Sequence, residues 1–402
     1  MRAIQTLLCL LVFTGAASAE FAFPVNCAHQ SLQSAINFAF PGTTLALKGS
    51  CAGPISIKTD GLTLNGAGTA SITGGGKDAV TINGAQRVTL TGLTVTGGNN
   101  GVVAENNASV TLTNVTITAN ALTGLLVEAN SSAAVNGGGS SGNGLDGVDL
   151  ETLSSLTVSG AYSTSSNGVF GLFINNGSSL SLTAATLTAG NNVVGAQVGT
   201  NAAAFEDGAS TFNASNNFAI GLTMVSGAHM ADFGGVLNVN SNGLQGIAID
   251  ARAGLDLDAG ALVQANGNAG DGVHLEQFSQ MTIFNTPAFS GVSATTTLTV
   301  NGNSAYGIDL LTNSAILVDN VAEILVSANA AGGVALDDGS SLSFGQNMPV
   351  PGTVHSTVVG NHPDIALTFA SRLTTLGSNI LGTITCDATS LTRGPLAVAC
   401  PH

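Results

Sequence analysis

The chain has 402 residues, of which 44% are hydrophobic, 8% are charged and 53 are glycine. The hydrophobic content is too high for a disordered chain, and the low charge density favours a packed fold. The formal net charge is −15, and the eight Lys and Arg residues are dispersed along the sequence. Dispersed bases in this number cannot neutralise a phosphate backbone, which excludes nucleic acid as a partner.

Residues 1–19 have the features of a secretory signal peptide. Arg2 precedes an apolar run at residues 7–13, and Ala17-Ser18-Ala19 places small residues before a cleavage site. The apolar run is too short to span a bilayer, and no later segment is long enough to be a transmembrane helix. We therefore expect a secreted or periplasmic protein whose first mature residue is Glu20.

The cysteines fall into two groups once the leader is set aside. Cys9 belongs to the leader, and the other four form one pair near each end of the chain. In an oxidising compartment we expect disulfides between Cys27 and Cys51 and between Cys386 and Cys400. These bonds would fix the two ends of the molecule.

A short helix is predicted in residues 31–40. Ser31 is a good N-cap residue, and one helical face carries Leu32, Ala35, Ile36 and Phe40. The pattern stops at a Pro-Gly pair at positions 41 and 42. We expect residues 20–43 to form an N-terminal cap that contains this helix, and residues 44–402 to form the main fold with its own C-terminal cap.

From position 44 onward short alternating apolar runs predict strands, and from Asn120 a repeat appears in which an Asn precedes a Gly by four residues. Successive glycines lie 23 to 26 residues apart, except for one step of 35 between Gly272 and Gly307. A fixed period in this range indicates a solenoid. The pairs are Asn120/Gly124, Asn143/Gly147, Asn167/Gly171, Asn191/Gly195, Asn217/Gly221, Asn242/Gly246, Asn268/Gly272, Asn303/Gly307 and Asn329/Gly333.

The residues after each glycine follow a strand pattern. The first and third positions are apolar in every repeat, as in Val148 and Leu150, while the second position is mixed and includes Asp149, His274 and Asp309. Alternation with period two places the apolar rows inside and the mixed row outside. Short parallel strands stacked in this way form a parallel β-helix, with about twelve or thirteen turns and a length of about 60 Å.

The asparagine column is explained by turn chemistry. Amides stacked one strand spacing apart can bond to one another and to the turn backbone. With this column and the starting helix, residues 27–400 resemble the secreted proteins of the pectin-lyase-like fold. The resemblance implies an all-β, single-stranded right-handed parallel β-helix. The group includes pectate lyases, polygalacturonases, pectin methylesterases, mannuronan epimerases and repeat proteins without an assigned reaction.

The catalytic motifs of those enzymes are not matched. The histidine lies in Val273-His274-Leu275 where polygalacturonases have Gly-His-Gly, and there is no Arg-x-Lys sequence. Mannuronan epimerases carry Asp-Pro-His-Glu, whereas this chain has Asn361-His362-Pro363-Asp364. We interpret that segment as a final turn that is one residue short.

Two groups of polar residues are candidate sites. The first is an acidic row that would bind Ca²⁺; the alternative is a solvated acidic edge without a ligand. The second would use a histidine among carboxylates for proton transfer; the alternative is an ordinary surface histidine. The predicted metal ligands are Glu105, Glu128, Asp149 and Glu151, and the predicted catalytic residues are Asp250, Asp271, His274, Glu276 and Asp309.

Two oversized segments, residues 284–292 and 344–359, are expected to wall a binding face near the histidine. The leading hypothesis is an exported, non-catalytic rod that displays a face to a polysaccharide or another surface component. The second is a polysaccharide lyase or glycoside hydrolase that uses the histidine group, with Ca²⁺ as the candidate cofactor. The third is a structural or adhesive repeat. Whether the chain is an enzyme, and its oligomeric state, stay open.

Overall fold

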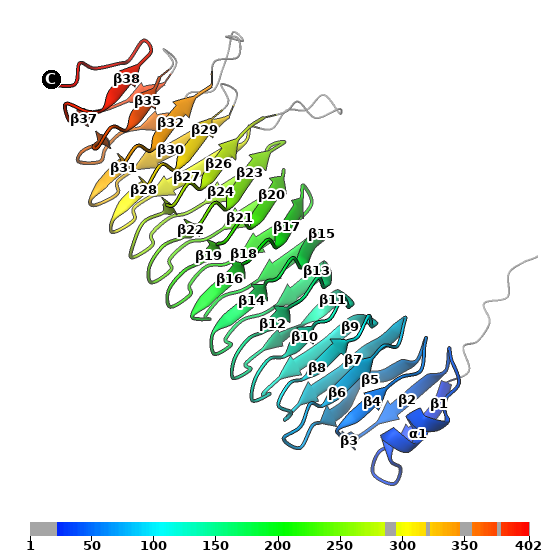
Figure 1. Ribbon diagram of the computed structural model, residues 1–402. Coiled ribbons are helices and arrows are strands. Elements are labelled where there is room, and N and C mark those ends of the chain that lie inside the picture. Colours follow the sequence, from blue (N-terminus) through cyan, green and yellow to red (C-terminus); the bar gives the residue numbers. More distant parts are fainter. Residues whose placement is uncertain (1–21, 286–294, 319–321, 346–355, 376–378, 402) are drawn as a thin grey trace, which may run out of the picture.

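The structure, a computed structural model, describes residues 22–285, 295–318, 322–345, 356–375 and 379–401. They form a single-stranded right-handed parallel β-helix, a rod whose turns stack in chain order from β1 to β38 (Figure 1). The all-β fold class is therefore confirmed. The predicted signal peptide and Cys9 lie outside the described residues. The helix among the described residues is far too short to cross a membrane.

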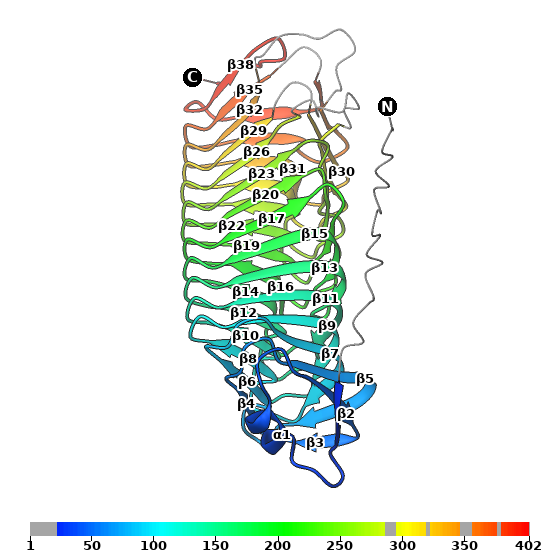
Figure 2. The same cartoon turned by 90° about the vertical axis from the view of Figure 1, so that its right-hand side faces the viewer.

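The N-terminal cap contains the predicted helix. Helix α1 (Leu32–Phe38) begins after Ser31, whose hydroxyl accepts a hydrogen bond from the Ser34 N–H at 3.2 Å. Leu32 and Ile36 are buried, so α1 covers the first end of the rod (Figure 2). Phe40 was wrongly predicted to share this face. The helix ends before it, and Phe40 is 79% exposed.

One wall of the rod is a sheet of 14 parallel strands, one from each turn. Fourteen strands about 4.8 Å apart span about 60 Å, as the repeat predicted. The strands are β4 (Ile55–Ile57), β6 (Val80–Asn83), β8 (Val102–Glu105), β10 (Leu125–Val127), β12 (Val148–Leu150), β14 (Phe170–Ile174), β16 (Val194–Val198), β19 (Leu222–Met224), β22 (Ile247–Ile249), β25 (Val273–Leu275), β28 (Tyr306–Leu310), β31 (Gly332–Leu336), β34 (Ile365–Leu367) and β37 (Ile384–Cys386).

The remaining walls are one sheet of 24 strands. In the N-terminal half, most turns contribute one long strand to this sheet, and the strand bends at a bulge where its register shifts. In later turns each long strand is replaced by two short ones. The strands are β1 (Ala22–Asn26), β2 (Thr44–Lys48), β3 (Ser50–Ala52), β5 (Thr63–Thr73), β7 (Val88–Thr96), β9 (Ser109–Thr118), β11 (Ser132–Ser141), β13 (Ser155–Ser163), β15 (Ser179–Thr188), β17 (Ala203–Asp207), β18 (Thr211–Asn213), β20 (His229–Phe233), β21 (Val236–Asn238), β23 (Gly254–Asp258), β24 (Leu262–Gln264), β26 (Gln280–Ile283), β27 (Thr297–Asn301), β29 (Ala315–Val318), β30 (Glu323–Ser327), β32 (Ser341–Phe344), β33 (Thr357–Val358), β35 (Arg372–Thr374), β36 (Ile380–Leu381) and β38 (Leu391–Arg393).

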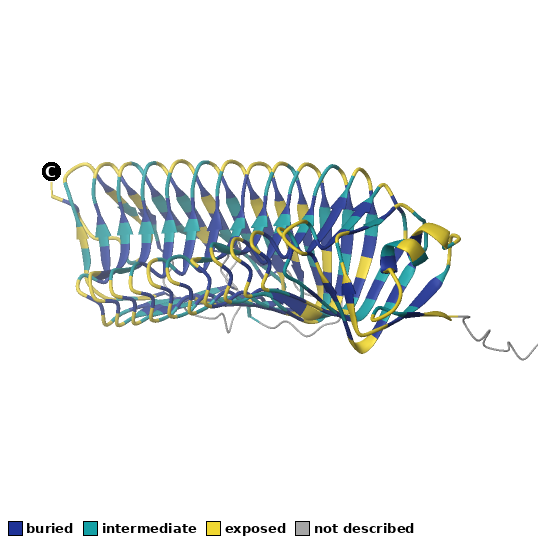
Figure 3. Cartoon of the chain, turned by 90° about the horizontal axis from the view of Figure 1, so that it is seen from below, coloured by how far each residue is buried: buried dark blue, intermediate teal, exposed yellow. Residues whose placement is uncertain are grey.

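The interior is a single apolar core that runs along the rod. The predicted inward rows are confirmed, since Val148, Leu150, Val273 and Leu275 are fully buried. Exposed residues gather at the outer turns, and buried residues alternate along the strands (Figure 3). Each turn buries its apolar side chains against those of the turns above and below, so neighbouring turns stabilise each other.

The asparagine column is a continuous ladder of hydrogen bonds. In each step, the side-chain Nδ2 of one asparagine donates to the Oδ1 of the asparagine one turn further on, at 2.9 to 3.5 Å. One member differs from the sequence prediction. The ladder uses Asn192, whereas Asn191 lies beside it in a left-handed conformation at φ 58°.

The last ladder member is Asn361, in the segment interpreted as a final short turn. Ile365 and Leu367, which follow it, point into the core as that interpretation requires. The side chain of Asp364 completes the ladder, because its Oδ1 accepts from the backbone and amide of Asn361 at 2.8 and 3.3 Å. The interpretation is confirmed.

The repeated glycine is required by close approach between turns. A Cβ on Gly147 would lie 2.6 Å from the Gly171 carbonyl oxygen and 2.7 Å from the Asn167 amide nitrogen. Any side chain here would push the next turn away and break the ladder.

Both expected disulfides are present, Cys27–Cys51 at the first end and Cys386–Cys400 at the last. The two oversized segments lie largely outside the described residues. The chain leaves the described part after β26 and after β32 and returns before β27 and β33, all strands of the 24-stranded sheet. The predicted histidine site is on the other sheet.

Candidate functional site

His274 lies on the outer face of the 14-stranded sheet. It is the central residue of β25, between two inward residues, and it is in register with Ala248 of β22 and Asp309 of β28. Residues in register on adjacent strands have neighbouring side chains on the same face. The repeat therefore places a carboxylate beside the imidazole on one side and a small methyl group on the other.

Three carboxylates surround the imidazole. His274 Nδ1 is 3.2 Å from Asp309 Oδ2 and 3.5 Å from Asp271 Oδ2, while Nε2 is 3.9 Å from Glu276 Oε2. The side chains of His274, Asp309 and Asp271 are 18%, 14% and 11% exposed. This group, the His274 cluster, is therefore mostly shielded from solvent.

Asp271 is held in place by the turn itself. It precedes the motif glycine, and its Oδ1 accepts a hydrogen bond from the Tyr306 N–H of the next turn at 2.9 Å. Asp146 does the same for the Phe170 N–H at 3.0 Å. An aspartate at this position is thus a turn-stabilising residue, and in Asp271 the second oxygen remains directed at His274.

The carboxylates favour a charged imidazole. Asp271, followed by Asp309, raises the pKa of His274 to about 10, against the opposing effect of burial. Nδ1 is buried, yet neither carboxylate meets the geometry of a directed N–H···O hydrogen bond with it. The contacts are electrostatic rather than well-aligned hydrogen bonds.

Four of the five predicted catalytic residues are brought together. Asp250 is the exception: its Oδ1 accepts a hydrogen bond from the neighbouring Ala251 N–H, and the ion pairs of His274 are with Asp271, Glu276 and Asp309. Asp250 occupies the column of Glu276 one turn earlier, as the repeat predicts.

The acidic row stacks on three consecutive turns as predicted, but its outer members have other partners. Asn83 donates a side-chain hydrogen bond to Glu105, and Asn176 donates one to Glu151. Burial, with smaller contributions from Glu105 and Glu151, raises the pKa of Glu128. The row thus carries mutual repulsion that no basic side chain in these contacts relieves.

Asp149 lies on the outer face in register with Leu126 and Phe173. Burial beside these side chains, and next the charge of Glu151, raises its pKa to about 8. Among the described residues, the His, Cys and acidic side chains whose ligand atoms come within 4.8 Å of one another are Asp271, His274 and Asp309. The calcium site at the acidic row stays a prediction.

The sequence reasoning missed a second pair of carboxyl groups, Glu206 and Asp232. They are in register on β17 and β20, point into the core and are fully buried. Burial, and then the neighbouring Asp232, raises the pKa of Glu206 to about 9, while burial raises the pKa of Asp232 to about 7. The inward–outward alternation of side chains, applied also to β17, would have placed Glu206 in the inward row, because Ala204 two residues earlier points inward.

An open groove follows the corner of the rod beside the asparagine column. Its volume is about 880 Å³, and its lining runs turn by turn from Gly76 to Phe218. Small residues such as Ala121, Gly144 and Gly168 form it, and Phe218 at one end is 76% exposed. We refer to it as the corner groove.

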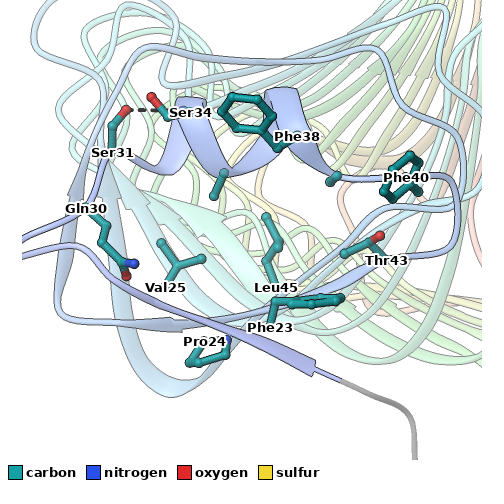
Figure 4. A pocket seen from close by; sticks show the side chains of 12 residues that line it. Phe23, Pro24, Val25, Gln30, Ser31, Ser34, Phe38, Phe40, Thr43 and Leu45 are labelled. Carbon is teal, nitrogen blue, oxygen red and sulfur yellow. Dashed lines mark hydrogen bonds between the residues drawn. The ribbon is translucent and has the colours of Figure 1, made fainter.

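Two other pockets lie elsewhere. One, of about 520 Å³, opens between β1 and α1 at the first end, where Phe23, Phe38 and Phe40 surround it (Figure 4). The other, of about 450 Å³, is lined by His229, Arg252 and Phe278 among others. His229 Nε2 forms an exposed ion pair with Asp256 Oδ2 at 2.9 Å.

No protein-family model matches this sequence, and no curated protein sequence matches it. Among solved structures, the A-module of the mannuronan C-5 epimerase AlgE6 of Azotobacter vinelandii is 14% identical, with a TM-score of 0.49 over 90% of this chain and 93% of that chain. A double mutant of the periplasmic alginate epimerase AlgG is 11% identical, with a TM-score of 0.37 over 94% and 84%. The alginate lyase AlyF-OU02 is 11% identical, with a TM-score of 0.34 over 93% and 88%. At these identities the likeness is confined to the architecture.

Proposed function

We propose that the protein is an exported, non-catalytic rod that binds a neutral polysaccharide chain along the corner groove. The observation that carries this proposal is the shape of the groove, which follows the rod axis across successive turns from Gly76 to Phe218. At about 4.8 Å per turn it is about 30 Å long. A groove that is long, shallow and open at its side suits an extended polymer better than a compact small molecule.

The lining supports contact with sugar rings. Gly144 and Gly168 are exposed, and their N–H groups donate to carbonyls of the preceding turn, so it is backbone carbonyl oxygens that can accept from sugar hydroxyls. The exposed ring of Phe218 offers a flat apolar face on which the C–H side of a sugar ring can stack.

Charge favours a neutral polysaccharide. The chain has 23 acidic residues against eight Lys and Arg, so it repels an anionic polymer unless cations bridge the two. Export is supported by the two disulfides, which form and persist in oxidising compartments.

Binding is tested with purified protein and a panel of neutral and anionic polysaccharides, by affinity electrophoresis and calorimetry. Phe218→Ala removes the stacking face, and Ala121→Trp fills the groove. Each is expected to weaken binding of the neutral ligand by about tenfold, which is about 1.4 kcal/mol. Phe369→Ala, at another exposed phenylalanine, is the matched control and should leave affinity unchanged.

Equal binding by wild type and both groove variants would place the ligand elsewhere on the rod. Tighter binding of anionic than of neutral chains, in the absence of divalent cations, would contradict the charge argument. Failure to bind any polysaccharide would refute the proposal.

A second candidate, a polysaccharide lyase or glycoside hydrolase, is favoured by the convergence of His274 with three carboxylates. Its test is incubation with the same panel, with and without Ca²⁺, while new unsaturated or reducing ends are measured. A non-catalytic rod releases none. Activity that disappears in a His274→Ala, Asp309→Ala double variant would establish the enzyme instead.

A further inference from the structure

We propose that Asp271, His274 and Asp309 form a binding site for a first-row transition-metal ion, with Zn²⁺ as the ion of best fit. The ligands would be His274 Nδ1, Asp271 Oδ2 and Asp309 Oδ2, whose separations from the nitrogen are 3.5 and 3.2 Å. Nitrogen and oxygen ligands of tetrahedral zinc lie about 2.0 to 2.2 Å from the ion, which places them about 3.3 Å from one another. The two distances bracket that value.

The orientation of the imidazole agrees with this assignment. Nδ1 is buried and near two carboxylate oxygens, yet neither oxygen lies where a directed hydrogen bond would place it. A tetrahedral ion bound along the lone-pair direction of Nδ1 would place its other ligands away from that line. Two oxygens near a buried Nδ1 that donates to neither of them are therefore placed better for a shared ion than for a shared proton.

The scaffold holds the three ligands before any ion arrives. Asp309 and His274 are fixed in register by the pairing of β28 with β25. The Tyr306 N–H donates a hydrogen bond to Asp271 Oδ1, so that Oδ2 faces the histidine. Glu276 Oε2 lies 3.9 Å from Nε2, the other ring nitrogen, which is near enough for charge attraction but too far for a hydrogen bond.

The ligand set distinguishes transition metals from calcium. Ca²⁺ takes six to eight oxygen ligands, roughly, whereas this group offers a nitrogen and two carboxylates from three side chains. Imidazole with carboxylates suits Zn²⁺ and neighbouring ions. Binding of the ion displaces the proton that the carboxylates favour on the imidazole, and the two carboxylates then balance the charge of one divalent ion.

The test uses the full chain without an affinity tag, stripped with EDTA and titrated with Zn²⁺ by calorimetry at pH 7.5. Co²⁺ serves as a spectroscopic probe, since its visible absorption reports tetrahedral coordination. We expect one saturable site per chain, a rise in melting temperature with Zn²⁺, and no competition from Ca²⁺. His274→Gln and Asp309→Asn should each weaken Zn²⁺ binding by more than about tenfold, and Glu276→Gln should have a smaller effect.

His229→Ala is the matched control, because His229 also faces an aspartate but in an exposed pair without a third ligand. It should bind Zn²⁺ as the wild type does. Circular dichroism and melting in EDTA establish that each variant is folded. Absence of saturable Zn²⁺ or Co²⁺ binding in the folded wild type, or binding unchanged in His274→Gln, would overturn the site. Neither outcome depends on polysaccharide binding.

Discussion

At the scale of single residues, the buried pair of Glu206 and Asp232 is the least expected feature of the core. Both side chains occupy inward positions that apolar residues fill in neighbouring turns, such as Leu182 and Leu257. The Gly235 N–H donates to Asp232 Oδ1 at 2.7 Å, and a Cβ on Gly235 would lie 2.6 Å from Glu206 Cγ. The pair is thus closely packed, and two charges there would be strongly disfavoured.

We predict that Glu206→Gln stabilises the protein at alkaline pH. The folded state keeps a proton on Glu206 up to about pH 9, whereas the unfolded chain releases it near pH 4.3, roughly. The free energy of unfolding therefore falls as pH rises between these values. The neutral amide removes this loss, so the variant should be more stable than wild type at pH 8, by on the order of 5 kcal/mol, and equal near pH 4.

Thermal unfolding followed by circular dichroism from pH 4 to pH 9 measures the difference. Asp338→Asn, at an exposed carboxylate, is the control that should keep the wild-type profile. A Glu206→Gln variant with the wild-type slope would mean that the carboxyl group is charged and solvated in the folded protein.

The sequence revealed the members of the His274 cluster but not this pair, and the reason is physical. His274 and Asp309 each sit one residue after an inward position that directly follows a motif glycine, so counting from the glycine places them reliably. Glu206 could be counted in the same way, since it is in register with the inward Leu182 of the other sheet, but the turns that flank the pair carry apolar residues at that position. Acidic side chains are also rarely fully buried, so there was no reason in the sequence to expect a carboxyl group at an inward position.

At the scale of elements, the asparagine ladder joins turns that otherwise touch through apolar contacts. Asn242 is typical: its Oδ1 accepts from the backbone and side chain of Asn217 at 2.9 and 3.1 Å, and its Nδ2 donates to Asn268 at 3.1 Å. It is 2% exposed, so these groups have no access to water as a substitute.

Asn242→Ala is expected to lower the free energy of unfolding by about 2 to 4 kcal/mol, because it leaves buried donors on Asn217 without an acceptor. Denaturant unfolding measures the change. Asn37→Ala, at an exposed asparagine of α1 that accepts from Gln33, should cost much less. Equal effects of the two substitutions would show that the ladder adds nothing beyond turn preference.

The sequence predicted this element almost completely, and its one error is instructive. The repeat pointed to Asn191, four residues before Gly195, whereas the ladder uses Asn192. The turn at this point is one residue shorter, as in the final turn at Asn361. With two adjacent asparagines, spacing alone cannot choose, since asparagine is suited both to the ladder and to the left-handed conformation that Asn191 adopts.

At the scale of the whole molecule, the ends are the places where stacking partners run out. A solenoid is held together by contacts between neighbouring turns, so its terminal turns are the first to open. Here each end carries a disulfide, and α1 also covers the first end.

Replacing Cys27 and Cys51 by alanine is expected to loosen the N-terminal cap, by about 3 kcal/mol for a loop of 24 residues. Hydrogen exchange followed by mass spectrometry should show faster exchange in β1 and α1 and no change in β22 to β28. The Cys386→Ala, Cys400→Ala variant should move the effect to the other end. Exchange that rises along the whole rod would mean that the molecule unfolds as one unit.

The architecture was predictable because one period repeats through the chain and each repeat has apolar residues at the same inward positions. The points at which the two oversized segments leave and rejoin the described chain were not predictable; both lie at strands of the 24-stranded sheet. A count of inserted residues does not tell which side of the turn they leave from. Only the spatial register separates a loop beside His274 from one on another wall.

The ladder also bears on how such a protein changes over evolutionary time. Among the asparagines of the ladder, each bonds only to those one turn away. The ladder therefore places no limit on the number of turns, unlike a closed barrel. Duplication or loss of a whole repeat in the coding sequence would still stack equivalent turns on one another, and it would change the length of the rod by about 4.8 Å. A fragment of any other size would put the asparagines and inward residues of the following turns out of register with those of the preceding ones.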